Sequence, residues 1–347
     1  MRLANSLRSV TPLETLKRIE SYLDDAQITR LANISHLDEM NLPVFCAIRP
    51  LASSLTVSQG KGLSESEAKI SAYMESLEVY FAENIQADIL NKPYEHNPLF
   101  INPNTLSKQI IYSRKQNYQW CQVESLLNHK RYYIPMEFLS IDTTDKAILL
   151  QGSDTTGLAS GNTKEEALVH SLFECIERDS ITSDYQVVNI DIDHPTYQLL
   201  SKDHQIQIRY YQSEFNSHTF GCFFKHRSTH ENQIIFSGYG CHFDKHIALN
   251  RALTEAIQAK LTLIAGSRDD IDAFAYQAVN QQQLANATKT INYSEIASES
   301  FDSVDTILKH LKSMLQTNGF DALVYIYHQQ SLCFLKSILI KHDLLAL

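Results

Sequence analysis

The feature that most constrains this chain is a helix pattern that occurs twice. Written as a template it reads G-x4-E-A-x6-E-x2-E, and it begins at Gly62 and again at Gly161. The two copies lie about one hundred residues apart, which is too long for the period of a solenoid. The pattern therefore indicates two duplicated halves that face one another. A shorter version, A-x6-E-x2-Q, begins at Ala248.

The first copy predicts a helix with carboxylates on an unusual face. Ser64 and Glu67 form a capping box at its start. Ser71, Glu75 and Glu78 then fall at i, i+4 and i+7 and share one face. Apolar residues flank this face on both sides: Ile70, Ala72, Met74, Leu77, Val79 and Phe81. A separate, solvent-exposed face is expected at Lys69, Ser76 and Glu83. Carboxylates between apolar flanks are costly unless a cation compensates them.

The segment before this helix, Ser58-Gln59-Gly60-Lys61-Gly62, is predicted to be a loop. Its two glycines would let the backbone turn or approach a ligand closely. Lys61 is then a candidate for binding phosphate oxygens.

The second and third copies carry the same chemistry. Gly161-Asn162-Thr163 leads into a helix on which His170, Glu174, Glu177 and Arg178 share a face. A third helix is predicted from about His246 to Ala265, with Gly266 as its C-cap. Its own shared face is formed by Ala248, Arg251, Glu255, Gln258 and Thr262. Five glutamates on three helices, with two arginines between them, indicate one shared site.

Such a site suits a hard cation. Oxygen ligands favour Mg²⁺, Mn²⁺ or Ca²⁺ over zinc, and Mg²⁺ is usually held by a few carboxylates together with a nucleotide's phosphates. Lys61, Arg178 and Arg251 are the candidates for binding those phosphates. The chain contains neither a G-x4-G-K-[ST] loop nor a kinase-type G-x-G-x-x-G, so neither familiar ATP loop is present.

Two alternatives remain at this point. A di-iron or di-manganese carboxylate protein would use Glu-x-x-His, whereas this chain has Glu-x-x-Glu twice and Glu-x-x-Gln once. The many strand signals also differ from a four-helix bundle. The second alternative is purely structural, with buried Glu–Arg pairs that hold subunits together. Three helices built on one template make that a minority interpretation.

Composition limits the class of protein. The 347 residues suffice for one large domain or two moderate ones, and a net charge of −10 without a long basic run argues against nucleic acid as the main partner. The six cysteines are scattered and contain no CxxC pair, which favours reduced buried thiols. No secretory h-region and no 18-residue apolar run occur, so we expect a soluble, cytoplasmic protein without membrane association.

The remaining elements are read from apolar periodicity and turn residues. A helix is expected after Thr11-Pro12, and strand–loop–strand over Thr29 to Arg49. The segment from Asn91 to Lys108 is expected to be a connecting loop. Strands are expected within 117–126, 130–139, 147–153 and 186–243, and after a polar loop at 277–289 a helix near Val304–Leu315 and two final strands.

The sequence resembles the YcaO family. The resemblance runs from about Arg8 to Asp270 and is most specific in three stretches that occur in the family's order: SQGKGLSESEAKISAYMESLEVY, TTGLASGNTKEEALVHSLFECIERD and YGCHFDKHIALNRALTEAIQAKLTLIAGSRDD. It implies an α+β, YcaO-type ATP-binding fold without a Walker motif. The expected organisation is one domain over 1–347, with a first half at 1–90, a connecting region at 91–160, a second half at 161–270 and a C-terminal region at 271–347.

The resemblance also implies an activity. YcaO enzymes use ATP and Mg²⁺ to phosphorylate a backbone amide oxygen of a peptide or protein substrate, as in the biosynthesis of ribosomally made, modified peptides. A Cys, Ser or Thr side chain then gives an azoline (cyclodehydratase activity), and an external sulfur donor gives a thioamide. An amide oxygen is a poor leaving group and phosphate a good one, so the chemistry is physically reasonable.

The resemblance also assigns roles to individual residues, according to their positions in the family's motifs. The resemblance implies metal binding by four glutamates: Glu75, Glu78, Glu174 and Glu177. It implies nucleotide binding by Ser71, Lys61, Arg178, Arg251, Gln258, Asn162 and Glu255. No catalytic base is identified. Three positions depart from the family's pattern: Val79 and Lys260 stand where Arg is frequent, and Thr156 where Asn is frequent. Lysine does not replace arginine in bidentate phosphate contacts.

The reaction type is inferred from two further features. Azoline-forming members often end in PxPxP, whereas this chain has no proline after Pro195. The stretch ITRLANISHLDEMNLPVFCAIRP looks most like members that act beside a TfuA protein, several of which make thioamides. We therefore expect thioamide formation with a TfuA-like partner or sulfur donor. The resemblance to the family also implies a homodimer. Ribosomal-protein modification is the alternative within the family, and a carboxylate-metal protein without a nucleotide is the alternative outside it.

Overall fold

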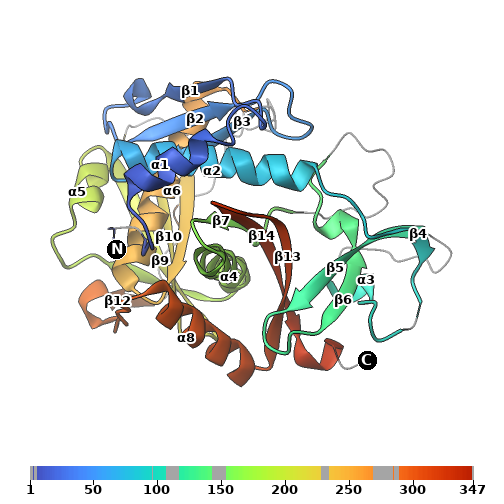
Figure 1. Cartoon of the computed structure of the whole chain (residues 1–347). Helices are drawn as coiled ribbons and strands as arrows, with labels where there is room; N and C mark the ends of the chain where they lie inside the picture. The colour runs from blue at the N-terminus through green and yellow to red at the C-terminus, as the bar shows by residue number, and fades with distance from the viewer. Residues whose placement is uncertain are drawn as a thin grey trace. The chain divides into compact units, whose positions relative to one another are not determined.

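The computed structural model describes residues 3, 6–95, 97–106, 117–142, 154–227, 234–268, 284 and 289–345. The chain forms two compact units (Figure 1). Unit 1 comprises residues 1–50, 55–76 and 176–302, and unit 2 comprises residues 51–54, 77–175 and 303–347. Each unit mixes helices with sheet, so the predicted α+β class is confirmed. The single-domain division of the chain stays a prediction.

Within the described residues, no helix is long and apolar enough to span a bilayer.

Unit 1 begins with helix α1 (Pro12–Glu20), whose N-cap is Thr11 with proline at the first helical position. A three-stranded antiparallel sheet follows, formed by β1 (Arg30–Asn33), β2 (Val44–Ile48) and β3 (Val57–Lys61). The short 3-10 helix η1 (Ser35–Leu37) connects the first two strands. The predicted strand–loop–strand at 29–49 is confirmed.

The predicted loop at Ser58–Gly62 is wrong, because most of it is strand β3. Gly60 is needed for close packing of β3 on the following helix: an added Cβ would lie 1.9 Å from the backbone nitrogen of Ala72. The close approach that glycine permits is therefore made to a helix of the same chain. The glycines and polar residues of this segment favour a loop when considered alone. The segment is a strand because it pairs with β2 and packs against the following helix.

The larger sheet of unit 1 has the order β11-β10-β9-β8-β12. Its strands are β8 (Tyr185–Asn189), β9 (His204–Gln212), β10 (His218–His226), β11 (Phe236–His242) and β12 (Thr290–Asn292). Two short helices, α5 (Pro195–Ser201) and η3 (Tyr293–Glu295), adjoin them. The strands predicted within 186–243 are confirmed. Helix α6 (Lys245–Ala265) lies along β11 and β10 (Figure 1).

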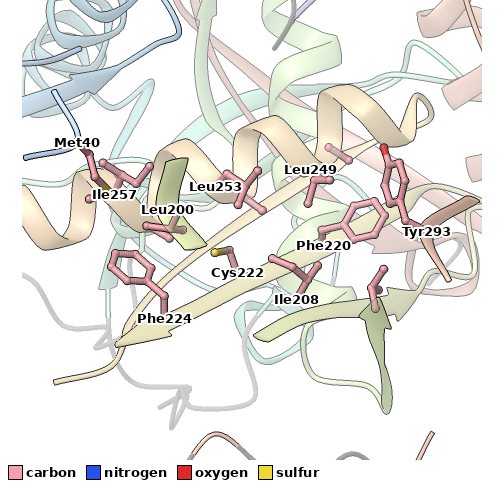
Figure 2. Close-up of a cluster of buried hydrophobic side chains, with 14 of the residues drawn as sticks. Met40, Leu200, Ile208, Phe220, Cys222, Phe224, Leu249, Leu253, Ile257 and Tyr293 are labelled. Atoms are coloured by element: carbon pink, nitrogen blue, oxygen red, sulfur yellow. The ribbon is translucent and has the colours of Figure 1, made fainter. Parts of the chain in front are cut away.

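The core of unit 1 lies between α6 and this sheet. Figure 2 shows Leu249 and Leu253 of α6 above Phe220 and Cys222 of β10. Alternate strand residues face the helix, as the twofold period of a strand requires. Since α6 is buried along most of its length, its half-exposed residues are fixed in position, and Glu255 is one of them.

Unit 2 contains a six-stranded sheet in the order β4-β5-β13-β14-β7, with β6 paired to β5. The strands are β4 (Ile89–Pro93), β5 (Asn117–Ser125), β6 (Arg131–Pro135), β7 (Leu158–Gly161), β13 (Phe320–Gln329) and β14 (Cys333–Lys341). The helices are α3 (Pro103–Leu106), η2 (Met136–Phe138), α8 (Val304–Thr317) and η4 (His342–Leu345). The predicted C-terminal helix and strands are confirmed.

Two predictions in this part of the chain have other outcomes. The connecting loop expected at Asn91–Lys108 is only partly correct, because it includes the end of β4 and all of α3. Pairing of β4 with β5 overrides the local turn preference of asparagine and proline. The strand expected at 147–153 and most of the polar loop at 277–289 lie outside the described residues.

The three template helices begin in the same way. Helices α2 (Glu65–Glu83), α4 (Lys164–Ser180) and α6 each follow a strand, and the capping residues Ser64, Thr163 and Asp244 each stand four positions before the template alanine. The Ser64 and Thr163 hydroxyls accept from the N–H of Glu67 and Glu166. The carboxylates of Glu67 and Glu166 accept in turn from the N–H of Leu63 and Asn162. The repeated pattern is thus a repeated strand-to-helix junction.

The solvent-exposed face predicted for α2 at Lys69, Ser76 and Glu83 is wrong at two of these three positions. Ser76 is 1% exposed and Glu83 is 8% exposed. The Glu83 carboxylate accepts hydrogen bonds from the N–H and hydroxyl of Ser54, at 2.8 and 2.6 Å. Lys69 does face outward and pairs with Glu65 at 3.1 Å. The hydrogen bonds from Ser54, which lies 29 residues earlier in the chain, offset the cost of burying the Glu83 carboxylate.

Candidate functional site

Three of the predicted glutamates form a carboxylate cluster within unit 1. Glu75 comes from α2, Glu177 from the last turn of α4 and Glu255 from the middle of α6. The charge of Glu255 raises the pKa of both of the others, so Glu255 lies close enough to repel each of them. We call Glu75, Glu177 and Glu255 the carboxylate cluster.

Glu255 is the member of the cluster whose ionised form is stabilised by its neighbours. Its carboxylate accepts from the Lys61 ammonium at 2.8 Å and from the backbone N–H of Tyr239 at 3.3 Å. Burial raises the pKa of Glu255, but Lys61, the Tyr239 N–H and the Arg251 charge together hold it below its ordinary value. Lys61 therefore supplies the counter-charge of Glu255.

Glu75 and Glu177 are less well compensated. Burial raises the pKa of Glu75, against the opposing charges of Arg268 and Lys61 and a hydrogen bond from the Gln59 N–H. Burial is also the main reason why the pKa of Glu177 is raised, to about 7, with the Glu255 charge adding to it. Both carboxyls are thus costly to ionise in a protein without a bound cation.

The positive groups that face the cluster come from separate elements. Arg251 and Arg178 lower the pKa of Glu177, and Arg268 lowers that of Glu75. Arg251 stands on α6 and Arg178 on α4, while Arg268 follows the C-cap of α6. Carboxylates and guanidinium groups together can hold both a cation and the anionic oxygens of a phosphate.

Gln258 is held by the backbone of strand β3. Its side-chain amide donates to the carbonyl oxygen of Gln59 at 2.8 Å. Gln59 is fully buried, and the hydroxyl of Thr262 on α6 donates to its side-chain oxygen. Its N–H donates to Glu75, so one residue of β3 positions side chains of two helices. Ser71 lies half-buried on α2, one turn before Glu75.

Unit 2 holds the other predicted residues. The Ser160 hydroxyl donates to the Glu78 carboxylate at 2.5 Å, and Glu174 lies half-buried on α4. Asn162 is buried, and its N–H and side-chain amide both donate to Glu166, at 2.8 and 3.0 Å. The amide of Asn162 thus has a structural partner, and its assignment to a nucleotide stays a prediction, as do the roles of Glu78 and Glu174.

The structure also shows what occupies two of the positions that depart from the family's pattern. Lys260 points to the loop after η1, where its ammonium lies 3.5 Å from both Asp38 and Glu39. Its charge is therefore paired with two acidic side chains of unit 1. Val79 is buried, so an arginine at this position would have to bury its charge.

Sequence reasoning missed Gln59, Arg268 and Ser160. Ser160 could have been found from the template, because Lys61 and Ser160 both directly precede the template glycine and both contact a motif glutamate. Gln59 acts mainly through its backbone, which no residue pattern reveals. Arg268 lies beyond the helix that ends at Gly266, so helical spacing does not place it with the glutamates.

The donor set fits Mg²⁺. Within the described ranges no three His, Cys, Asp or Glu side chains are grouped closely enough to form a metal site as they stand. The cluster nevertheless offers hard carboxylate oxygens, and burial, with a smaller contribution from the Glu255 charge, raises the pKa values of Glu75 and Glu177. A divalent cation would favour the ionised form of both carboxyls.

The chain belongs to the YcaO family. Residues 59–336, well over half of the chain, match the family model described as YcaO cyclodehydratase, ATP- and Mg²⁺-binding. A protein from the tfuA 3′ region of Rhizobium leguminosarum bv. trifolii is 30% identical over 310 residues, which cover 79% of this chain and 71% of that protein. The predicted family is confirmed, and with it ATP and Mg²⁺ as the ligands of the family.

Solved structures confirm the fold. A heterocyclase in complex with substrate and cofactor matches with a TM-score of 0.81 at 20% identity, over 98% of this chain. The present chain spans about half, 54%, of that heterocyclase chain. The YcaO protein of Methanopyrus kandleri, bound with AMPPCP and Mg²⁺, matches with a TM-score of 0.77 at 18% identity, over 97% of this chain and 92% of that one.

The raised pKa of Glu177 predicts a pH-dependent stability. Its folded value of about 7 lies above the ordinary 4.5, so between these values the folded state holds more protons than the unfolded state. The free energy of unfolding is then expected to fall as pH rises from 5 to 7.5, by on the order of 2 kcal/mol, in the absence of Mg²⁺. Urea midpoints across this range measure it.

Glu177→Gln should remove most of this decline, whereas Glu65→Gln, at an exposed position of α2, should leave it intact. Parallel curves for wild type and Glu177→Gln would contradict the prediction.

Proposed function

We propose that this protein uses ATP and Mg²⁺ to activate a backbone amide of a peptide or protein substrate, and that a sulfur nucleophile then converts the amide to a thioamide. The carboxylate cluster carries the proposal, because Glu75, Glu177 and Glu255 face the cationic side chains of Lys61, Arg178 and Arg251. Membership of an ATP- and Mg²⁺-binding family supports a nucleotide over a carboxylate-metal site without one.

In this proposal Glu75 and Glu177 of unit 1 are metal ligands, and metal binding by Glu78 and Glu174 is proposed from their motif positions alone. The ion supplies charge neutralisation of the phosphate oxygens. Lys61, Arg178 and Arg251 bind phosphate oxygens, and Ser71, Asn162, Glu255 and Gln258 complete the nucleotide contacts. Lys61 would then exchange its bond with Glu255 for one with a phosphate oxygen of the nucleotide.

The chemistry balances as two displacements. The amide oxygen attacks a phosphorus atom of ATP, forming one P–O bond while another breaks and the nucleotide leaves. The sulfur nucleophile then adds to the activated carbon, and phosphate departs with the former amide oxygen. Lys61 and the arginines act in the first step by neutralising charge that develops on the phosphoryl oxygens.

A TfuA-like partner and a homodimeric state are parts of the proposal. The relative from the tfuA 3′ region supports a partner of this kind. Thioamide formation, in place of azoline formation, is the finer part of this proposal, which the mass of the modified peptide tests. The alternative substrate is a ribosomal protein, which would be modified by the same chemistry.

Calorimetry with ATP tests the nucleotide part of this function. We expect micromolar affinity that requires Mg²⁺, and little binding without the metal. Absence of nucleotide binding, together with tightly held iron or manganese in the purified protein, would overturn the proposal. For the reaction, mass spectrometry of a peptide encoded beside the gene should show replacement of oxygen by sulfur; loss of one water would indicate an azoline instead.

A further inference from the structure

A row of side chains crosses the larger sheet of unit 1 on the face opposite α6. Gly221 of β10 is in register with Tyr239 of β11 and with Arg209 of β9. The neighbours of Tyr239, Gly238 and Gly240, pack against α6, where an added Cβ would lie 2.1 and 2.2 Å from the helix backbone. Successive residues of a strand point to opposite faces. Tyr239 and Arg209 therefore point away from α6.

Three aromatic rings meet over Gly221. A Cβ added to Gly221 would lie 3.0, 3.1 and 3.2 Å from ring atoms of Phe223, Tyr239 and Tyr211. The ring centres of Phe223 and Tyr239 are 5.8 Å apart, and those of Tyr211 and Tyr239 are 6.4 Å apart. The absence of a side chain at Gly221 thus lets rings from three strands form one surface, on which Phe223 and Tyr239 are only half-buried.

Arg209 is held in place by this surface. Its guanidinium carbon lies 3.9 Å from the ring centre of Phe223 and 4.5 Å from that of Tyr185. A guanidinium group is attracted to the face of an aromatic ring. Nε donates to the side-chain oxygen of Gln207 at 2.8 Å, and a second hydrogen bond is made to the Tyr211 hydroxyl. The position of the guanidinium is fixed, and further N–H donors remain for a ligand.

The charge of Arg209 has no carboxylate partner within the part of the chain that the structure describes. Its partners there are an amide, a phenol and two rings, none of which is an anion. Arg209 is half-buried, and a charge in that position without a counter-ion is costly. Because a guanidinium binds oxyanions through paired N–H donors, a carboxylate or phosphate group would complete this site.

The surface is connected to the carboxylate cluster through Tyr239, whose backbone N–H donates to Glu255 at 3.3 Å. Burial raises the pKa of the Tyr239 hydroxyl, and the charges of Arg209 and Arg178 oppose that effect. The charges of Glu255 and Glu177 raise the same pKa further. The Tyr239 side chain thus lies within the electric fields of both the cluster and Arg209.

Two considerations select the anion. In the proposed function Lys61, Arg178 and Arg251 already bind the phosphates, so the peptide is the ligand that still needs a binding surface. The aromatic rings beside the guanidinium also suit the methylene groups of an acidic side chain, which phosphate lacks. Both considerations favour a carboxylate of the peptide.

We propose that Arg209, between the rings of Tyr185 and Phe223, is the recognition site for an aspartate or glutamate side chain of the peptide substrate. Neighbouring strands are about 4.8 Å apart, so Arg209 lies roughly 10 Å across the sheet from Tyr239. An extended peptide covers that distance in about three residues. The identity of the peptide as substrate rests on the proposed function, whereas the preference of Arg209 for a carboxylate does not.

Selection from a library of short random peptides tests the preference, with the full chain as bait, in the presence and in the absence of Mg²⁺ and AMPPCP. Aspartate and glutamate should be enriched at one position of the peptides that bind wild type. Arg209→Gln should abolish that enrichment. Arg227→Gln is the matched control and should keep it, since Arg227 is exposed in the same unit and donates to backbone carbonyl oxygens. Selection of no peptide, or of peptides without an acidic preference, would overturn the inference.

A paired comparison then assigns the effect to Arg209. Changing the acidic residue of a selected peptide to its amide should lower the affinity of wild type at least about tenfold and that of Arg209→Gln hardly at all. An equal loss in both proteins would contradict the inference. If Arg209→Gln does not fold, Arg209→Lys decides: it should bind the acidic peptide more weakly than wild type does and the amide peptide equally well. Unchanged affinity for the acidic peptide would count against the site.

Calorimetry with ATP and Mg²⁺ separates this inference from the proposed function. Arg209→Gln should bind ATP as wild type does, because the proposed phosphate ligands are other residues. A loss of affinity of about tenfold or more would show that Arg209 binds phosphate, and the inference would fail. If wild type itself binds no ATP, the proposed function fails, and the peptide selection without nucleotide still decides whether Arg209 recognises a carboxylate.

Discussion

Replacing Glu75 and Glu177 together by glutamine is expected to weaken Mg²⁺-dependent ATP binding by at least about a hundredfold, or roughly 2.7 kcal/mol. The change removes two of the three carboxyl groups of the carboxylate cluster but keeps the shape of the side chains. A neutral amide is a much poorer magnesium ligand than a carboxylate. Calorimetry with ATP at fixed Mg²⁺ measures the effect.

This variant should fold at least as well as the wild-type protein. Both carboxyls have a raised pKa, so their ionised forms are unfavourable in the protein without metal, and neutral glutamine relieves that cost. Lost binding with an unchanged or higher Tm would therefore report on the site and not on unfolding. Glu65→Gln, on the exposed side of α2, is the control and should bind ATP normally. Retained Mg²⁺-dependent affinity in the double variant would remove these two glutamates from the metal site.

Gly60→Ala is expected to have the largest effect on folding. The new Cβ would lie 1.9 Å from the backbone nitrogen of Ala72 and 2.4 Å from the carbonyl oxygen of Ala68. Backbone atoms of a helix cannot rotate away as a side chain can, so β3 and α2 would have to separate. We expect a loss of on the order of 3 kcal/mol or more in the free energy of unfolding. Urea denaturation measures it.

Gly319→Ala provides a matched comparison. Gly319 has a φ of 72°, and nothing lies within 4 Å of an added Cβ. Only the backbone strain of a left-handed alanine remains, about 1 kcal/mol. Equal losses for the two variants would show that the contact between β3 and α2 is less tight than the structure indicates.

Local sequence signals predicted the template helices and their ends well. The capping residues Ser64 and Thr163 and the C-cap Gly266 act on neighbours within four positions, so their effect is visible in the sequence. Gly60 was misread because a glycine has the same local signature in a loop and in a tightly packed strand. Glu83 was misread because its partner, Ser54, lies 29 residues away.

The candidate site was predictable to a similar degree. Helical spacing identified the glutamate face, because side chains four positions apart on a helix must be neighbours. The bond between Lys61 and Glu255 joins residues 194 positions apart, and no local rule gives such a pairing. The backbone role of Gln59 is also beyond residue-type patterns, since any residue carries the same N–H and carbonyl groups.

Strand β3 is an edge strand of its sheet, and its free edge is where a foreign strand could pair. In this protein the N–H and carbonyl of Gln59 are already bonded to Glu75 and Gln258. The side chains proposed to bind the metal and the nucleotide thus also block strand addition at this edge. Variants that lack both side chains should therefore be watched for self-association, which would mimic a loss of activity while arising from an uncovered sheet edge.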